Sequence, residues 1–347
     1  TETNNKRLVS ITAVSAEKTY GEADPPFAPA IMSNQVAGEL TDISLAVSRS
    51  DAGDDTVGKH EGVLSISATK EALEAEYTNY TFTIVPADFT VNTNQNGLTV
   101  SASDVEQTYD GTGYGVTAQA NKPGATILYK DANGEYTLTE SPKQTDVGSL
   151  TVEFKASLYG YADAYGTATE TNNKRLVSIT AVSAEKTYGE ADPPFAPAIM
   201  SNQVAGELTD ISLAVSRSDA GDDTVGKHEG VLSISATKEA LEAAYTNYTF
   251  TIVPADFTVK VNPNGLTVSA ENVNQVYDGT AYGVTPAANK TGATILYKDA
   301  NGEYTLTESP TQKDVGEKTV EFKASLYGYA DAYGSAKIKI TPRPVTI

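Results

Sequence analysis

Hydrophobic and polar side chains alternate along much of the chain with a period of two, and helical periodicity is nearly absent. The alternation is clear over residues 43–48, 64–68 and 152–158, where apolar side chains fall on one face of the segment. Residues 80–84 and 89–91 are rich in Thr, aromatic and β-branched side chains. We therefore predict strands with one buried and one solvated face, as in antiparallel sheets.

Two short segments depart from this pattern. Residues 131–134, with the sequence Asp-Ala-Asn-Gly, separate the apolar stretches 127–129 and 136–138. Because Asn-Gly tolerates the positive φ of a tight turn, we predict a β-hairpin here. Residues 70–76 contain several good helix formers, and they predict one short helix that connects two strands.

The chain is an internal duplication. Residues 1–168 recur almost letter for letter as residues 169–336, and residues 1–91 differ from their copy only at Glu76, which corresponds to Ala244. A catalytic chain needs a single site, whereas a chain that copies whole modules is usually selected for length or multiplicity.

Each copy has two halves that carry different motifs. The first half contains Tyr-Gly-Glu-Ala-Asp-Pro at residues 20–25, and the second contains Tyr-Asp-Gly-Thr at residues 109–112. We predict four mainly β modules in tandem, each a small β-sandwich or β-grasp-like unit of roughly 80–90 residues, in an extended chain with short, stiff linkers. The predicted boundaries are 1–91 (module A1), 92–172 (module B1), 173–259 (module A2) and 260–347 (module B2).

Composition and charge narrow the functional classes. The 347-residue chain has no Cys, which excludes disulfides and cysteine-ligated metals and fits a Gram-positive surface better than a disulfide-rich ectodomain. Its net charge of −20 argues against a nucleic acid partner, because phosphate binding needs a basic footprint. No apolar run is long enough to span a bilayer, and we expect the sequence to be part of a longer protein.

The motifs of the first half resemble the MBG domains of bacterial surface proteins. The shared pattern is Lys-x-Tyr-Gly-x-x-Asp-Pro, followed by a Gly before a later strand and by Asn-Tyr near the end. The matching residues are Lys18, Tyr20, Gly21, Asp24, Pro25, Gly58, Gly62, Asn79 and Tyr80 in module A1, and Lys186, Tyr188, Gly189, Asp192, Pro193, Gly226, Gly230, Asn247 and Tyr248 in module A2. Modules B1 and B2 are similar to the related YDG-type repeats, through Tyr109, Asp110 and Gly111 and through Tyr277, Asp278 and Gly279.

This resemblance implies a large adhesin-like protein on the bacterial cell surface, with a Gram-positive cell wall as the expected location. In such proteins the modules form stalks or bind host mucus and glycans. We expect a stalk segment that projects a distal binding domain; the alternative is a set of weak mucin- or glycan-binding modules that act by avidity. We expect a monomer whose contacts are with neighbouring repeats, and no enzyme, because no catalytic constellation is marked in the sequence.

The motif residues predict structural turns. In Tyr20–Pro25, Gly21 permits a left-handed conformation, Asp24 is expected to cap its own backbone, and Pro25 fixes φ, with Tyr20 packed over the turn. The same interpretation applies to Tyr109–Gly111 and to the copies of both motifs in the second half of the chain.

An acidic loop raises the question of a metal ion. Asp51, Asp54 and Asp55, repeated as Asp219, Asp222 and Asp223, offer the carboxylates that calcium prefers. The twelve-residue EF-hand loop is absent, so a solvated acidic loop is the simpler interpretation and calcium the alternative. We expect no other cofactor.

Two further features leave alternatives open. A Lys–Asn isopeptide crosslink is conceivable between Lys18 and Asn79, and between Lys186 and Asn247, provided that the Lys and a nearby acid are buried. His60 and its copy His228 lack the second His of a zincin motif, and we expect them on the surface. The recurrent tyrosines suit either sugar or protein contact or half-buried strand positions; they are Tyr159, Tyr161 and Tyr165, with copies Tyr327, Tyr329 and Tyr333.

Overall fold

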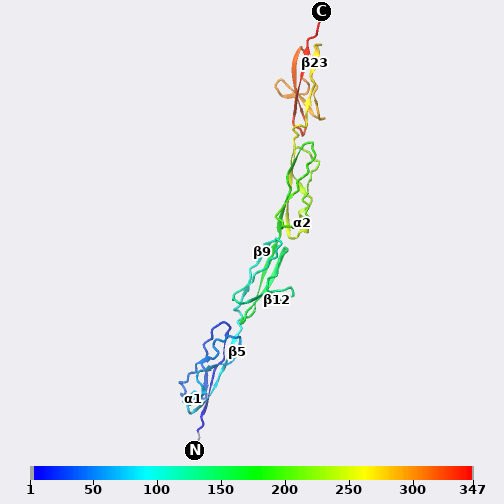
Figure 1. Ribbon diagram of the computed structural model, residues 1–347. Coiled ribbons are helices and arrows are strands. Elements are labelled where there is room, and N and C mark those ends of the chain that lie inside the picture. The colour runs from blue at the N-terminus through cyan, green and yellow to red at the C-terminus, as the bar shows by residue number, and fades with distance from the viewer. Residues whose placement is uncertain (1–3, 346–347) are drawn as a thin grey trace. The chain divides into compact units, whose positions relative to one another are not determined.

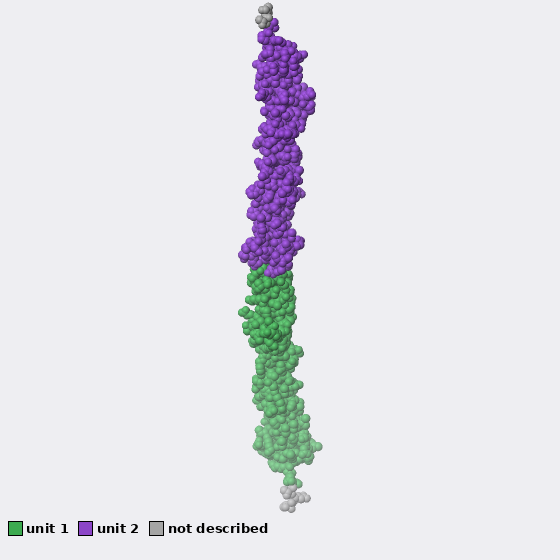
Figure 2. Space-filling view, turned by 90° about the vertical axis from the view of Figure 1, so that its right-hand side faces the viewer, with its two compact units in different colours: residues 1–173 green, residues 174–347 purple. Residues whose placement is uncertain are grey.

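The computed structural model describes residues 4–345 and divides into two compact units, residues 1–173 and 174–347 (Figures 1 and 2). Regular structure in each unit is almost entirely β, with one short helix per unit among the described residues. Neither helix has the length and apolar character that crossing a membrane requires.

Module A1 contains two sheets, and consecutive strands carry the chain from one sheet to the other. Its elements are β1 (Arg7–Thr12), β2 (Ala16–Thr19), β3 (Ile31–Ser33), β4 (Val47–Arg49), β5 (Gly58–Ile66), α1 (Lys70–Glu76), β6 (Tyr80–Val85) and β7 (Ala87–Asn92). The sheet orders are β3-β1-β6 and β2-β7-β5-β4. The chain passes from one sheet to the other between β1 and β2 and again between β6 and β7, so β1–β6 and β2–β7 are parallel pairs while the remaining pairs are antiparallel.

The core of module A1 follows from the alternation of apolar positions. In the first sheet Val9, Ile11 and Phe82 are fully buried, and Leu73 of helix α1 packs against them. In the second sheet Phe89 is fully buried and belongs to a separate apolar cluster. Alternate residues of one strand therefore point into the core, as the period of two predicts.

Helix α1 is confirmed at the predicted residues, Lys70–Glu76. Its first turn is capped by Thr69, whose Oγ1 accepts a hydrogen bond from the backbone N of Ala72 at 3.2 Å. Such a cap satisfies one of the free N–H groups of a helix start. The helix connects β5 of one sheet to β6 of the other, as expected for a connection between two strands.

The predicted strand over residues 43–48 is wrong over residues 43–46. Strand β4 begins only at Val47, because a turn precedes it in which the N of Ile43 approaches the O of Leu40 at 3.4 Å and Leu40 has a φ of 60°. Ile43 is nevertheless buried in the core. The apolar alternation here reflects burial of an irregular segment rather than a strand.

Module B1 is built around one five-stranded sheet. Its elements are β8 (Val100–Ser101), β9 (Val105–Thr108), β10 (Gln119–Ala120), β11 (Thr126–Lys130), β12 (Tyr136–Leu138), β13 (Gly148–Ser157) and β14 (Ala164–Asn173). The order is β12-β11-β13-β14-β9, and β10-β8 form a second, two-stranded sheet. Figure 1 shows β9 and β12 within this module.

Two predictions for module B1 are confirmed. Val152, Phe154 and Ala156 of β13 are buried and alternate with partly exposed residues. Strands β11 and β12 form the predicted hairpin, in which Gly134 has a φ of 89° and the N of Asp131 donates to the O of Glu135 at 2.7 Å. The turn is therefore closed by a residue that tolerates positive φ.

The second unit repeats this architecture. Its elements are β15 (Arg175–Thr180), β16 (Ala184–Thr187), β17 (Ile199–Ser201), β18 (Val215–Arg217), β19 (Gly226–Ile234), α2 (Lys238–Ala244), β20 (Tyr248–Val253), β21 (Ala255–Lys260), β22 (Val268–Ser269), β23 (Val273–Val276), β24 (Ala287–Ala288), β25 (Thr294–Lys298), β26 (Tyr304–Leu306), β27 (Gly316–Ser325) and β28 (Ala332–Thr341). The strand orders correspond sheet by sheet to those of the first unit.

The mainly β fold of small modules in tandem is thus confirmed. Within each described unit the strand pairs fall into two sets, one on each side of the predicted A–B boundary. Strands β7 and β14 each run one residue past a predicted boundary, to Asn92 and Asn173. The module boundaries themselves stay a prediction.

Candidate functional site

Modules A1 and B1 meet at three tyrosines. Tyr20 follows β2 at the start of its turn motif, and Tyr159 and Tyr161 lie in the connection between β13 and β14. The ring of Tyr20 contacts both others edge-on, with centroid distances of 5.7 Å to Tyr159 and 5.4 Å to Tyr161 and interplanar angles of 87° and 84°. We call this cluster, with the hydrogen bonds described below, the tyrosine joint.

Asn94, from the link between the modules, connects both sides of the joint. Its side-chain Nδ2 donates to the O of Tyr20 at 3.1 Å, and its backbone N donates to the O of Gly160 at 2.9 Å. The N of Ala162 donates back to the O of Asn94 at 3.0 Å. The link is therefore bonded to both modules through one residue.

Tyr159 adds a contact to a loop of module A1. Its hydroxyl accepts a hydrogen bond from the backbone N of Val57 at 3.0 Å, and Val57 lies in the loop between β4 and β5. The joint therefore involves two separate segments of module A1, the Tyr20 turn and the acidic loop that contains Val57.

The close approach across the joint requires glycine at two positions. A Cβ at Gly160 would lie 2.3 Å from Cδ1 of Tyr20, and Gly160 has a φ of 84°. A Cβ at Gly97 would lie 2.6 Å from Cε1 of Tyr161. Distances this short are not compatible with a side chain, so the packing of the tyrosines depends on both glycines.

The second unit contains the same joint. Tyr188 contacts Tyr327 and Tyr329 edge-on at 5.7 and 5.4 Å, and the N of Val225 donates to the hydroxyl of Tyr327 at 2.8 Å. A Cβ at Gly328 would lie 2.2 Å from Cδ1 of Tyr188. The motif Tyr-Gly-Tyr of each B module therefore closes against the Tyr of the preceding A module.

Beside the joint, module A1 buries two cations. Lys18 of β2 and Arg49 of β4 are 8% and 6% exposed, and both are paired with acids. The Nζ of Lys18 lies 2.7 Å from Oδ1 of Asp24 and 2.5 Å from Oδ1 of Asp55. The guanidinium of Arg49 lies 3.2 Å from Oδ1 of Asp24 and 2.7 Å from Oδ1 of Asp51. We call these residues the ion network.

The ion network contacts the hydrophobic core and changes the pKa values of its own residues. The guanidinium carbon of Arg49 lies 4.2 Å above the ring centre of the buried Phe89, a cation–π contact. The hydrogen bond from Lys18 holds the pKa of Asp24 below its usual range, and the hydrogen bond to Asp24 raises the pKa of Lys18. The network therefore favours the charged forms of both residues.

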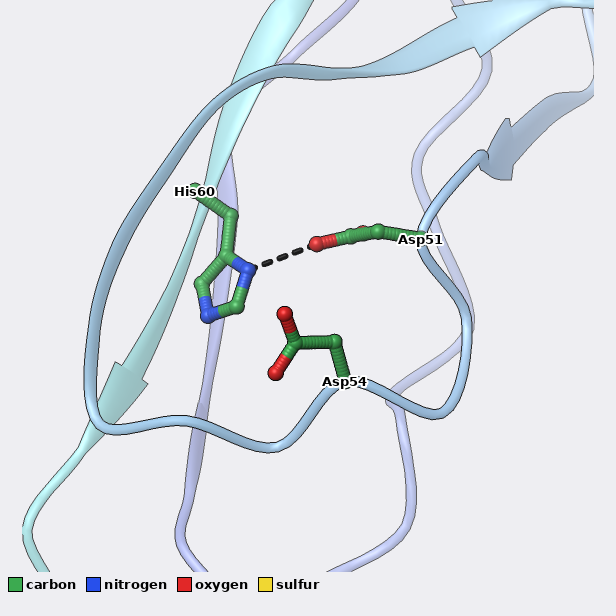
Figure 3. Close-up of side chains that lie close together, drawn as sticks. All are labelled: Asp51, Asp54 and His60. Carbon is green, nitrogen blue, oxygen red and sulfur yellow. Dashed lines mark hydrogen bonds and ion pairs between the residues drawn. The ribbon is translucent and has the colours of Figure 1, made fainter.

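His60 belongs to the same network instead of lying on the surface as expected (Figure 3). Its Nδ1 lies 2.6 Å from Oδ2 of Asp51 and its Nε2 lies 2.8 Å from the O of Thr56. The hydrogen bond to Thr56 and then that to Asp51 raise the pKa of His60. With an oxygen acceptor at each ring nitrogen, the imidazolium form fits this position and leaves no lone pair for a metal.

The carboxylates of the calcium hypothesis are bonded to other groups of module A1. Asp51 contacts Arg49, and Asp55 contacts Lys18. Oδ1 of Asp54 accepts a hydrogen bond from the N of Thr56 at 3.0 Å. Within residues 4–345, the groups of His and acids close enough to share an ion are Asp51, Asp54 and His60 and their copies Asp219, Asp222 and His228. Calcium binding stays a prediction for titration to test.

The residues of the isopeptide hypothesis are not brought together. Lys18 lies in β2 with its ammonium held by two carboxylates, whereas Asn79 is exposed and precedes β6 of the other sheet. In module A2, Lys186 is likewise paired with Asp192 and Asp223, and the backbone O of Asn247 accepts from Arg175. A Lys–Asn crosslink would require the lysine and the asparagine of each module to leave these positions.

The turn motifs differ from one another in how the Asp is used. Gly21 and Gly111 have φ values of 82° and 81°, and their copies Gly189 and Gly279 have 83° and 85°. Asp110 caps its own turn, since its Oδ1 accepts from the N of Thr112 at 2.8 Å, and Asp278 repeats this bond. For Asp24 the prediction is wrong, because two buried cations occupy its carboxylate.

A second tyrosine pair lies on the outer face of the five-stranded sheet. Tyr165 of β14 is 61% exposed, and its ring lies 5.5 Å from that of Tyr136, edge to face. The ammonium groups of Lys130 and Lys155 both lie 5.9 Å from the Tyr136 ring centre. The pair recurs as Tyr333 and Tyr304 in the second unit.

Comparison with known proteins identifies the A modules. The family model of the MBG domain (YGX type) matches residues 9–90 and residues 177–258. Among curated proteins, no sequence matches the chain.

Solved structures that resemble the chain include extracellular adhesion proteins. The protocadherin γB4 extracellular domain matches at 10% identity with a TM-score of 0.33, covering 99% of this chain and 68% of that one. The human desmocollin-1 ectodomain matches at 12% identity with a TM-score of 0.24. The match covers 75% of this chain and 64% of the desmocollin chain, so it spans less than two thirds of the desmocollin ectodomain. Drosophila N-cadherin EC1-4 matches at 12% identity with a TM-score of 0.21, covering 97% of this chain and 100% of that one. Likenesses at these TM-scores carry no inference about this chain.

Proposed function

The chain carries two MBG domains of the YGX type, residues 9–90 and 177–258, and on this premise we propose that it is a stalk segment of a bacterial cell-surface adhesin. Its role is mechanical and not catalytic: it holds a distal binding domain away from the cell. We place it outside the cell, on a Gram-positive cell wall, as an extended monomer that contacts neighbouring repeats.

The tyrosine joint is the observation that supports this proposal. A spacer transmits position only if its modules resist bending at the links between them. In each unit the link has no Gly/Ser-rich stretch, and three aromatic rings and a bonded Asn fill the junction. Edge-to-face ring pairs contribute about 0.5–1.5 kcal/mol each beyond the area that they bury, so bending at this link has a definite energetic cost.

A distance measurement within the first unit tests the proposed stiffness. Because the chain has no Cys, cysteines at the exposed positions Glu71 and Asn133 introduce two unique spin labels in modules A1 and B1. We expect one narrow distance distribution by pulsed electron paramagnetic resonance. The Tyr20→Ala variant is expected to broaden it, and Tyr165→Ala, which removes a tyrosine outside the joint, is expected to leave it narrow.

A broad distribution in the unmodified pair would contradict the stalk proposal. Small-angle scattering of the whole chain gives a second test, since an extended monomer has a larger radius of gyration than a compact protein of 36.5 kDa. A value that fits the compact protein would argue against a spacer.

Weak, multivalent binding of mucin or other glycans is the second candidate function. It is favoured by the exposed Tyr165 beside Tyr136 and its copy Tyr333 beside Tyr304. Aromatic rings with a polar edge suit contact with sugars, and two equivalent weak sites gain from avidity.

A glycan array distinguishes the two candidates. If the surface pair binds sugars, the double variant Tyr165→Ala and Tyr333→Ala loses the signal more steeply than either single variant, because both sites contribute to avidity. Tyr159→Ala with Tyr327→Ala is the matched control at the joint. No signal from the unmodified chain would remove the glycan candidate.

A further inference from the structure

The two B modules differ at two buried positions of their last strand. Glu170 and Asn172 of β14 are 0% and 1% exposed. By the pairing of β13 with β14 and of β27 with β28, they occupy the places of Ile338 and Ile340, which are 0% and 2% exposed. The second unit thus has two apolar residues where the first has a carboxyl and an amide.

Glu170 lies between two strands with no polar partner. It is opposite Leu150 of β13 and Val105 of β9. Neither Oε1 nor Oε2 has a hydrogen-bond partner. Asn172 is better accommodated, because its Nδ2 donates to the O of Gln144 and of Thr145, although its Oδ1 has no partner.

The charged groups on the neighbouring elements are engaged elsewhere. Glu106 of β9 accepts from Asn173, Glu153 of β13 pairs with Lys130, Lys155 of β13 pairs with Asp163, and Asp104 accepts from the N of Thr169. In the described part of the chain none of these groups contacts the Glu170 carboxyl. Burial without compensation raises the pKa of Glu170 above its ordinary value.

We propose that β14, the last strand of module B1, is a pH-dependent weak point. It opens more readily at neutral pH than in acid, and module B2 has no such strand. At neutral pH the open strand exposes an ionised carboxyl to water, whereas the closed strand must either bury an unpaired charge or take up a proton, and either cost favours opening. Protonation of the carboxyl removes this penalty.

The sign of the pH effect follows from linkage. A carboxyl whose pKa is raised in the folded state binds its proton more tightly there than in the open state. Its stability contribution is fully present below the unfolded value of 4.5 and is lost as the pH rises through the folded value. Module B2 carries Ile338 at this place and lacks the effect.

The position of this strand suggests what the weak point does. Strand β14 ends at Asn173 and β15 begins at Arg175, so a pull along the chain passes through β14. Under load module B1 is then expected to unfold before module B2, and to unfold less readily in acid. This role rests on the proposed stalk function, whereas the stability difference between the two B modules does not.

Hydrogen exchange of the whole chain compares the two modules in one sample. Peptides that begin at Gly148 and Gly316 differ in sequence at their next two residues, so β13 and β27 are followed separately by mass. After correction for intrinsic exchange, we expect amides of β13 and β14 to open more often than those of β27 and β28 at pH 7.5, because the buried Glu170 carboxyl has no partner in the closed strand. At pH 4.5 the difference is expected to shrink.

Three variants assign the effect to the carboxyl. Glu170→Ile is expected to abolish the excess opening of module B1, and Glu170→Gln is expected to abolish its pH dependence while keeping a polar group. Ile338→Glu is expected to transfer both properties to module B2. Equal exchange in the two modules at pH 7.5, or a difference that Glu170→Gln leaves dependent on pH, would overturn the proposal.

A force measurement separates this inference from the stalk proposal. In single-molecule stretching at pH 7.5, module B1 is expected to unfold at lower force than module B2, and Glu170→Ile is expected to equalise them. If exchange differs but the unfolding forces do not, the role under load is wrong and the pH-dependent strand stands. A broad label distance in the first unit would instead argue against the stalk and leave the exchange result intact.

Discussion

The ring of Tyr20 stands edge-on to the ring of Tyr161, with a centroid distance of 5.4 Å and an interplanar angle of 84°. The two residues are far apart in the sequence and belong to different modules of the first unit. Tyr188 and Tyr329 repeat the same distance and angle in the second unit. The duplicated chain thus conserves the geometry of the joint together with the modules that it connects.

Replacing Gly160 by Ala is expected to disrupt the tyrosine joint. The added Cβ would lie 2.3 Å from Cδ1 of Tyr20, so the ring or the β13–β14 connection must move. We expect a loss of about 2–4 kcal/mol in the free energy of unfolding of the first unit, as strain at positive φ adds to overpacking. Urea unfolding and the label distance between modules A1 and B1 measure the two effects.

Gly124 provides a matched control. Its φ of 84° equals that of Gly160, but a Cβ there would meet no atom within 4 Å. Gly124→Ala should therefore show the backbone strain alone, about 1–2 kcal/mol, with an unchanged label distance. Equal losses for the two variants would mean that the contact with Tyr20 contributes nothing.

Replacing Arg49 by Met is expected to destabilise module A1 strongly. Arg49 is 6% exposed and pairs with Asp24 and Asp51. Its removal therefore leaves Asp24 with Lys18 alone and Asp51 with His60 alone. Breaking a buried ion pair from one side costs about 3–5 kcal/mol, and the partial exposure of both Asp residues places the expected loss near the lower value, about 3 kcal/mol. Denaturant unfolding followed by hydrogen exchange in module A1 measures it.

Lys59→Met is the control for this prediction. Lys59 also pairs with an acid, Asp88, at 2.7 Å between Nζ and Oδ2, but its side chain is 56% exposed. Exposed ion pairs contribute little to stability because water screens them, so we expect a much smaller loss than for Arg49→Met. Similar losses for Arg49→Met and Lys59→Met would show that burial of the ion network does not matter.

Added calcium is expected to leave the thermal unfolding midpoint unchanged. A calcium ion at Asp51, Asp54 and Asp55 has to compete with Arg49 and Lys18, whose charged groups already contact two of the three carboxylates. A ligand that binds only the folded state raises the midpoint with its concentration. A rise with calcium that magnesium does not reproduce would establish the site that the acidic sequence predicts.

The sequence predicted those elements whose formation depends on residues close together along the chain. The helix over residues 70–76, the hairpin at residues 131–134 and the buried face of residues 152–156 all follow from propensity, turn chemistry and alternation. These features are decided by neighbours within a few residues, which a single sequence displays directly.

The joint and the ion network could not be predicted in the same way. The sequence marks Tyr20 and Asp24 as turn residues, but their partners, Tyr161 and Arg49, become neighbours only through the tertiary fold. Nothing local distinguishes the buried Arg49 from a surface arginine. The recurrent Tyr-Gly-Tyr of the B modules was the available signal, since Gly between two tyrosines indicates a close approach to another group.

Glu74 gives a pH-dependent prediction that concerns helix α1. Its Oε1 accepts hydrogen bonds from the hydroxyl of Thr81 and from the N of Phe82, and these bonds lower its pKa from 4.5 to about 2. The resulting stability is present above pH 4.5 and is lost as the pH falls toward 2. In Glu74→Gln this part of the acid transition of module A1 is expected to disappear, because the amide does not titrate. Acid unfolding monitored by hydrogen exchange of β6 measures this change. Glu71→Gln, at an exposed position of the same helix, is the control. An acid transition that Glu74→Gln leaves unchanged would show that the carboxylate does not hold β6 to the helix.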